Sequence, residues 1–181
     1  MIKYCKIINN STGLCDVGLG TNDKYYISIG MEQRDVEQSD IDNNWYLKEK
    51  CPKKTTEQKL QEAKENKYQE ALQGAKNYIE NNAVYQFDSN NSIEATDGNI
   101  GKMTAFALGF QAGTIQSVSW TTKEDNVLIL NAQDVLEILT GLGEIQADIW
   151  NVEFVNYKNQ IENASDIEEV EAININYGGG V

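Results

Sequence analysis

The sequence predicts an α+β fold in which short antiparallel hairpins pack on helices. Short runs of β-forming residues are separated by turns rich in Asn, Gly and Ser, as in β-hairpins. Between these runs lie segments whose apolar residues recur every three or four positions, as in amphipathic helices. The chain has 181 residues, of which 40% are hydrophobic. This length fits one ordinary domain, or a small module joined to a larger one.

Residues 1–52 are expected to form a small β-rich module. Two hairpins are predicted, with turns at residues 9–13 and 42–44, and a short helix over residues 23–29 lies between them. A module of this size is marginal by itself. We therefore expect it to pack on something else.

Residues 53–82 are expected to form a helix that connects this module to the rest of the chain. Thr55 and Gln58 have the spacing of a capping box, which marks the start of the helix. Its apolar residues make only a narrow stripe on a very polar surface. Such a helix serves as a connector, or it pairs with another helix across an interface.

Residues 83–176 are expected to form a C-terminal α+β domain, followed by a glycine-rich tail at residues 177–181. The tail should be flexible, or lie flat against a partner. The domain should contain two hairpins and three helices, the helices capped by Asp97, Asn131 and Ser165.

The long helix after Asn131 carries a heptad-like row of apolar residues. Their steps alternate between three and four, as in a coiled-coil seam. This row either faces the core of its own domain or also pairs across a homo-oligomer, and the pattern leaves both open. Gly141 and Gly143 are expected to weaken or kink the helix. The six residues of this candidate interface are Val135, Ile138, Leu142, Ile145, Ile149 and Val152.

Charge and composition argue against several classes of function. The net charge is −13, so the surface should repel both nucleic acid and anionic membranes. There is no histidine, which excludes Ser-His-Asp and Cys-His nucleophiles and histidine-containing zinc sites. The start of the chain has no apolar core typical of a signal peptide, and no window is apolar enough to span a membrane. We therefore expect a non-enzymatic protein made in a cytoplasm, without cofactor or metal.

The remaining motifs are weak. Gly98–Thr104 has some features of a phosphate loop but the wrong spacing, and is expected to be a helix start. Residues 88–94 alternate like a calcium loop but lack its glycine, and are expected to be a polar turn. Cys5 and Cys15 could face each other across a hairpin, as a disulfide or, as we expect, as reduced thiols. Carboxylates are plentiful, yet no pair stands out as catalytic. The tryptophans Trp45, Trp120 and Trp150 form either a contact surface or, by default for the last two, part of the core.

The second half of the chain carries an ordered set of motifs. Its pieces are Asn99–Phe106, a W-T-T-x-x-D-N turn at Trp120–Asn126, a leucine-rich helix at 135–142, Lys158, and an I-x-x-A-x-x-x-E-E-V segment at 161–170. In this order they resemble an uncharacterised domain family of bacteriophage and prophage tail regions. The opening of the chain, with Lys3–Asn9, Ser28–Met31 and Trp45-Tyr46, is similar to the openings of small tail proteins.

The resemblance implies a structural protein of the virion tail, attached to or near the tail fibres and made in the bacterial host cytoplasm. Its partners would be other tail or fibre proteins. The homo-oligomer that we also expect follows from the heptad-like row and not from the resemblance. The family has no agreed catalytic or binding residues to carry over. Alternatives are an assembly chaperone for tail fibres that the virion does not retain, a carboxylate-based glycan hydrolase, and a protein that binds a host factor.

Overall fold

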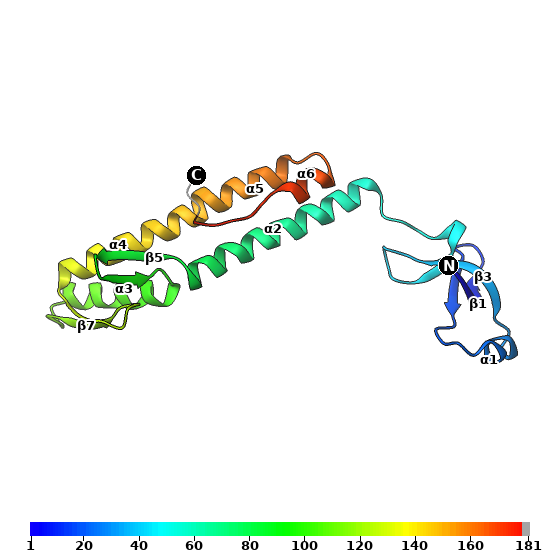
Figure 1. Ribbon diagram of the computed structural model, residues 1–181, viewed down its shortest axis with the longest axis horizontal. Coiled ribbons are helices and arrows are strands. Elements are labelled where there is room, and N and C mark those ends of the chain that lie inside the picture. Colours follow the sequence, from blue (N-terminus) through cyan, green and yellow to red (C-terminus); the bar gives the residue numbers. More distant parts are fainter. Residues whose placement is uncertain (179–181) are drawn as a thin grey trace. The chain divides into compact units, whose positions relative to one another are not determined.

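The computed structural model describes residues 1–178, which divide into two units at Lys59 and Leu60. About 49% of the chain is helix and 22% is strand, in small antiparallel sheets, so the predicted α+β class is confirmed (Figure 1). The division lies inside a helix and not at residues 52 and 82. The reason is that most of this helix packs into the larger unit, as described below.

The smaller unit is a closed four-stranded barrel. Both predicted hairpins form. In addition, β1 of the first hairpin pairs with β3 of the second, and β2 pairs with β4, so that the closed order is β1-β2-β4-β3 with all pairs antiparallel. Each strand therefore has two neighbours, which removes the free edges that a pair of separate hairpins would expose. The elements are β1 (Ile2–Asn9), β2 (Leu14–Val17), α1 (Asp23–Ser28), β3 (Glu32–Gln38), β4 (Trp45–Leu47) and a 3₁₀ turn η1 (Lys48–Lys50).

The core of the barrel contains two thiols. Cys5 and Cys15 are buried together with Val36, and both cysteines are free. Burial, together with the neighbouring Cys15, raises the pKa of the Cys5 thiol to about 11. A protonated, buried thiol is a poor nucleophile. In this structure the pair therefore serves as small apolar core residues, in agreement with the expectation of reduced thiols.

The larger unit contains two hairpins and a long helical rod (Figure 1). The rod consists of residues 132–163, in which helix α4, the π-helix η2 and helix α5 follow one another without a break. The elements are α2 (Thr56–Asn81), β5 (Val84–Asp88), β6 (Asn91–Glu94), α3 (Asp97–Gln111), β7 (Val118–Thr121), β8 (Val127–Leu130), α4 (Ala132–Asp148), η2 (Ile149–Glu153, the π-helix), α5 (Phe154–Asn163) and α6 (Ile167–Ala172). Within residues 1–178 no helix has the length and apolar character that a membrane span requires.

Helix α2 is part of the larger unit and not a bare connector. The predicted capping box is present, since the Thr55 amide donates to Gln58 and the Gln58 amide donates to Thr55. Further along, the ring of Tyr68 meets the ring of Phe154 edge to face, with 5.5 Å between centroids. The Lys64 Nζ donates to the carbonyl of Glu162 over 2.8 Å. These contacts place α2 antiparallel to the rod, and its buried residues are Ala71, Ala75 and Ile79.

Tyr177 also belongs to the core, although it was assigned to a glycine-rich tail. Its hydroxyl donates to the carbonyl of Ala71 over 2.8 Å, and its ring meets that of Tyr157 edge to face. Gly74 on α2 makes room for the ring, because a Cβ there would lie 3.0 Å from it. The glycine-rich tail itself lies outside the described residues from 179 onward.

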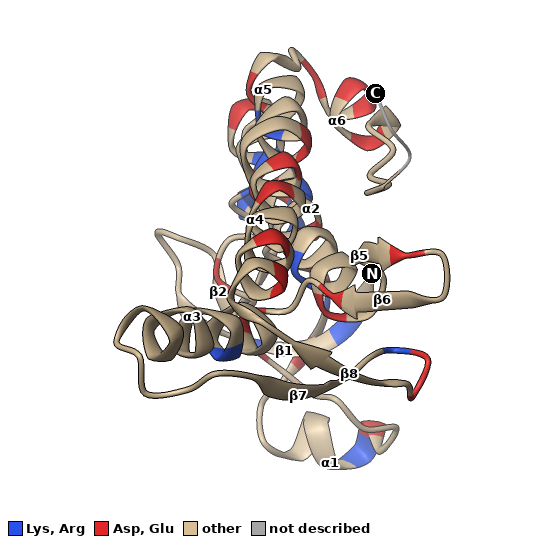
Figure 2. Cartoon of the chain, turned by 90° about the vertical axis from the view of Figure 1, so that its left-hand side faces the viewer, with Lys and Arg blue, Asp and Glu red and all other residues tan. Residues whose placement is uncertain are grey.

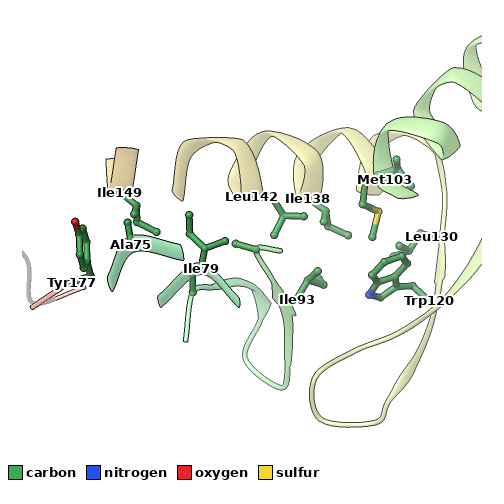
Figure 3. Close-up of a cluster of buried hydrophobic side chains, with 13 residues drawn as sticks. Ala75, Ile79, Ile93, Met103, Trp120, Leu130, Ile138, Leu142, Ile149 and Tyr177 are labelled. Atoms are coloured by element: carbon green, nitrogen blue, oxygen red, sulfur yellow. The ribbon is translucent and has the colours of Figure 1, made fainter. Parts of the chain in front are cut away.

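The heptad row lies mostly in the core of its own unit, which is one of the two alternatives that the sequence leaves open. The face of α4 that carries it is covered by α2, the hairpin β5–β6 and α3 of the same unit (Figure 3). Val135, Ile138, Leu142 and Ile149 are buried, Ile145 is half-buried against the same core, and Val152 is 52% exposed.

The π-helix explains why Val152 leaves the row. A π-turn contains more residues than an α-turn, so the side chains after it are rotated about the helix axis. The half-buried and buried apolar residues of the rod accordingly continue at a shifted register, through Trp150, Phe154, Tyr157 and Ile161. A strict heptad drawn through the sequence misses this shift.

Two of the three predicted caps are displaced by one residue. Asn131 caps α4 as expected and forms a capping box with Asp134. Helix α3 is capped by Thr96 and not Asp97. Helix α6 is capped by Asp166 and not Ser165, whose amide and hydroxyl instead donate to Glu169.

Candidate functional site

Each unit exposes large apolar side chains. In the barrel unit four of them, Leu19, Tyr25, Ile27 and Ile29, lie on the segment from the end of β2 to the start of β3, where helix α1 buries none of its residues; Met1, Ile2, Ile8 and Ile41 are exposed elsewhere. In the larger unit Leu108 and Leu136 are 60% and 51% exposed, and Val127, Ile129, Val152 and Val155 are exposed elsewhere. Clustered apolar side chains on a protein surface mark contact sites more often than isolated ones do.

Leu108 and Leu136 border a groove between α3 and α4, which we call the α3–α4 groove. Its volume is about 560 Å³, and its walls come from these two helices alone. It lies outside the core contact of the two helices, in which Met103 and Ile138 are fully buried. The flanking apolar residues then line the seam on the outside. The lining residues are Thr104, Ala107, Leu108, Phe110, Gln111, Ala132, Leu136 and Leu139.

The surroundings of the α3–α4 groove are acidic. Leu136 also borders a second hollow of about 290 Å³, which contains Glu137, Glu144 and Tyr85. The Tyr85 hydroxyl donates to the Glu137 carboxylate over 3.2 Å. Asp134 and Asp148 complete the charged residues of α4, which has no Lys or Arg (Figure 2). The groove thus joins an apolar floor to a carboxylate-bearing side.

Charge is distributed unevenly between the two units. Residues 1–59 contain nine basic and nine acidic side chains, whereas residues 60–181 contain six and nineteen. The whole net charge of −13 therefore belongs to the larger unit. Because charge complementarity selects partners, the two units should favour contact surfaces of different chemistry.

The W-T-T-x-x-D-N turn locks the two hairpins of the larger unit together. The Ser92 amide donates to Glu124 over 2.8 Å, and the Ser92 hydroxyl donates to the other carboxylate oxygen. The Lys123 amide donates to the Ser92 carbonyl over 3.0 Å. The Asn126 side chain donates to the Asn91 side chain over 3.0 Å. These contacts come mainly from Lys123 and Glu124, at the two variable positions of the turn, and from Asn126; we call this set of contacts the Ser92–Glu124 clasp.

We expect the Ser92–Glu124 clasp to make stability depend on acid pH. Hydrogen bonds from the Ser92 hydroxyl and amide lower the pKa of Glu124 from 4.5 to about 2. A depressed carboxyl pKa stabilises the fold above its ordinary value, and this contribution is lost as the pH falls to the folded-state value. Glu124→Gln should therefore lower the midpoint of thermal unfolding at neutral pH and reduce its further fall between pH 4.5 and about 2.

Thermal unfolding of wild type and variant across this range is the measurement. The matched control is Glu171→Gln, which removes an exposed carboxylate from α6. An acid response of Glu124→Gln as steep as that of the wild type would contradict the role of the clasp.

The other weak motifs also have structural roles. In the stretch that resembled a phosphate loop, the Lys102 ammonium lies 5.6 Å from the centre of the Trp120 ring. In the stretch that resembled a calcium loop, Asp88 accepts hydrogen bonds from the Asn90 amide and the Asn91 side chain. Among residues 1–178, no cluster of three or more His, Cys, Asp or Glu side chains is suited to hold a metal ion.

The three tryptophans are all engaged inside the chain. Trp120 is buried and meets Phe106 edge to face, and Trp150 packs on Phe154 in the same way. Trp45 packs against the barrel core and has the Lys3 ammonium 4.3 Å from its ring centre. The default expectation of core positions is correct for Trp120, and Trp150 is half-buried against the core.

Sequence reasoning missed the α3–α4 groove. Leu136 falls within the predicted leucine-rich helix, and Leu108 belongs to none of the predicted motifs. Neither leucine has a local signal, because the apolar residues of α3 are spread around that helix and Leu136 is one of several apolar residues of α4. Comparisons of the chain with protein-family models, with curated proteins and with solved structures found no match.

Proposed function

We propose that this chain is a non-enzymatic structural protein of a phage tail, attached to or near the tail fibres, that works through protein–protein contacts. The observation that carries the proposal is that each unit exposes apolar side chains, around Tyr25 and Ile27 in the barrel unit and at the α3–α4 groove in the larger one. The net charges of the two units differ, since the barrel unit has equal numbers of basic and acidic side chains and the larger unit is strongly acidic. The tail location is supported by the resemblance of the second half of the chain to tail-region proteins.

Two units with different surfaces suit a protein that joins two partners. The α3–α4 groove would receive one tail or fibre protein, and the exposed segment around Tyr25 and Ile27 another. Self-association, the other expected contact, needs a surface outside the buried heptad row. The barrel unit offers one with no net charge to oppose the approach of a second copy. Light scattering of the purified chain measures this oligomeric state.

Mass spectrometry of purified phage particles tests the proposal. The chain should be present at a defined, low copy number when it is quantified against the major tail-tube protein of the same particles. The matched sample is the lysate of infected cells before particle purification. Presence in the lysate with absence from particles would contradict a virion role and would favour the assembly chaperone or the host-factor-binding protein.

A further inference from the structure

We propose that the α3–α4 groove binds an amphipathic helix of a partner protein, with apolar anchors on one face of that helix and Lys or Arg beside them. The inference rests on the proposed action through protein contacts, but not on the location in a phage tail. It is argued from the shape of the groove, from the elements that form it and from the charges beside it.

The dimensions of the groove suit a helix. It extends along α3 from Thr104 to Gln111, which is about 10 Å at the rise of an α-helix. Anchors that are one turn apart on an incoming helix fit within this length. The volume of about 560 Å³ is that of a formed binding site and larger than a packing defect. Leu108 and Leu136 remain more than half exposed at its border, where a macromolecule would cover them.

The walls of the groove favour a helix over an extended peptide. All eight lining residues belong to α3 or to α4. The backbone amides and carbonyls inside these helices are already paired with each other, so the lining offers no strand edge to which a peptide strand could add. Recognition must therefore use side-chain anchors, which is how helices bind in grooves.

The charges select a basic partner. Leu136 belongs to both the groove and the neighbouring hollow, so a helix seated over Leu136 brings its flank close to Glu137 and Glu144. No Lys or Arg of α4 offsets these carboxylates. A second copy of the same surface would set two acidic helices against each other, which is unfavourable. Complementary Lys or Arg residues on the incoming helix make the same contact favourable.

Fluorescence anisotropy with three synthetic peptides of equal length tests this inference on the full chain. The first peptide has leucines on one helical face and lysines on the others. The second has glutamates in place of the lysines, and the third has the composition of the first with the leucines scattered around the helix. The first should bind at least tenfold more tightly than either of the others, and added salt should weaken it.

Matched variants locate the binding. Leu136→Ser should weaken the first peptide about tenfold, whereas Val152→Ser should leave it unchanged. The two residues lie on the same helical rod and are 51% and 52% exposed, so folding should be affected equally little. Glu144→Gln should reduce the effect of salt on binding, and Glu171→Gln should not. Circular dichroism of each variant confirms that the fold is retained.

Other outcomes overturn the inference. These are no binding of the first peptide, equal binding of the first and third peptides, tighter binding of the acidic peptide, and equal weakening by Leu136→Ser and Val152→Ser. Each result is independent of the particle analysis. A chain absent from virions can still bind the first peptide, and a chain present in virions can fail to bind it, so the two proposals fail separately.

Discussion

Leu142→Ala is expected to lower the free energy of unfolding of the larger unit by about 2–5 kcal/mol. Leu142 is fully buried in the core formed by the hairpins, α2 and the rod, and truncation leaves a cavity among rigid neighbours (Figure 3). Chemical denaturation followed by circular dichroism measures the loss, because most of the helical content belongs to this unit.

The matched control is Val152→Ala on the same rod. Val152 is 52% exposed, so its truncation should change the free energy of unfolding by less than about 0.5 kcal/mol. The two variants separate the core role of the heptad row from the interface role that the sequence left open. If Leu142→Ala kept its stability and only changed the oligomeric state, the core assignment would be wrong.

Gly141→Ala is expected to destabilise the larger unit by about 1–3 kcal/mol, although alanine is the better helix former. A Cβ at Gly141 would lie 2.2 Å from the ring of Tyr85, which packs directly on the helix backbone. The Tyr85 ring is also held by its hydrogen bond to Glu137. The ring therefore has to move, and its contacts with the core are disturbed. Thermal or chemical unfolding measures the loss.

Gly143→Ala provides the control within the same helix. A Cβ there meets nothing within 4 Å, so only the gain in helix propensity remains. We expect Gly143→Ala to stabilise the unit by up to about 1 kcal/mol. In a Tyr85→Ala background, Gly141→Ala should lose its penalty and behave like Gly143→Ala. A penalty that persists without the Tyr85 ring would show that the close approach is not its cause.

The local features of the chain could be predicted because they depend on neighbouring residues. The four hairpins follow from alternating β-formers and turn residues, and the Thr55–Gln58 capping box and the Asn131 cap follow from short-range hydrogen bonds. Displacements of one residue at Thr96 and Asp166 arose where two adjacent polar residues were both able to cap. The α+β class is the sum of these local features.

The candidate site could not be predicted in the same way. The heptad row was visible in sequence, but whether it faced a core or a partner depended on what covers α4. The α3–α4 groove depends on how two helices meet, and the leucines at its border have no local signature. Tyr177 looked like the start of a glycine-rich tail because its partner, Ala71, lies 106 residues away in the chain.

The sequence by itself therefore determined the hairpins, the helices, most of their ends and the acidic character of the second half. These properties arise from hydrogen bonds and side-chain periodicity over a few residues, and from composition. Only the tertiary structure decided that the hairpins of the first unit close into a barrel, that α2 belongs to the second unit, and that the heptad row is core. It also decided where apolar side chains remain exposed. The physical reason is that burial depends on which distant segments pack together, and no short stretch of sequence contains that information.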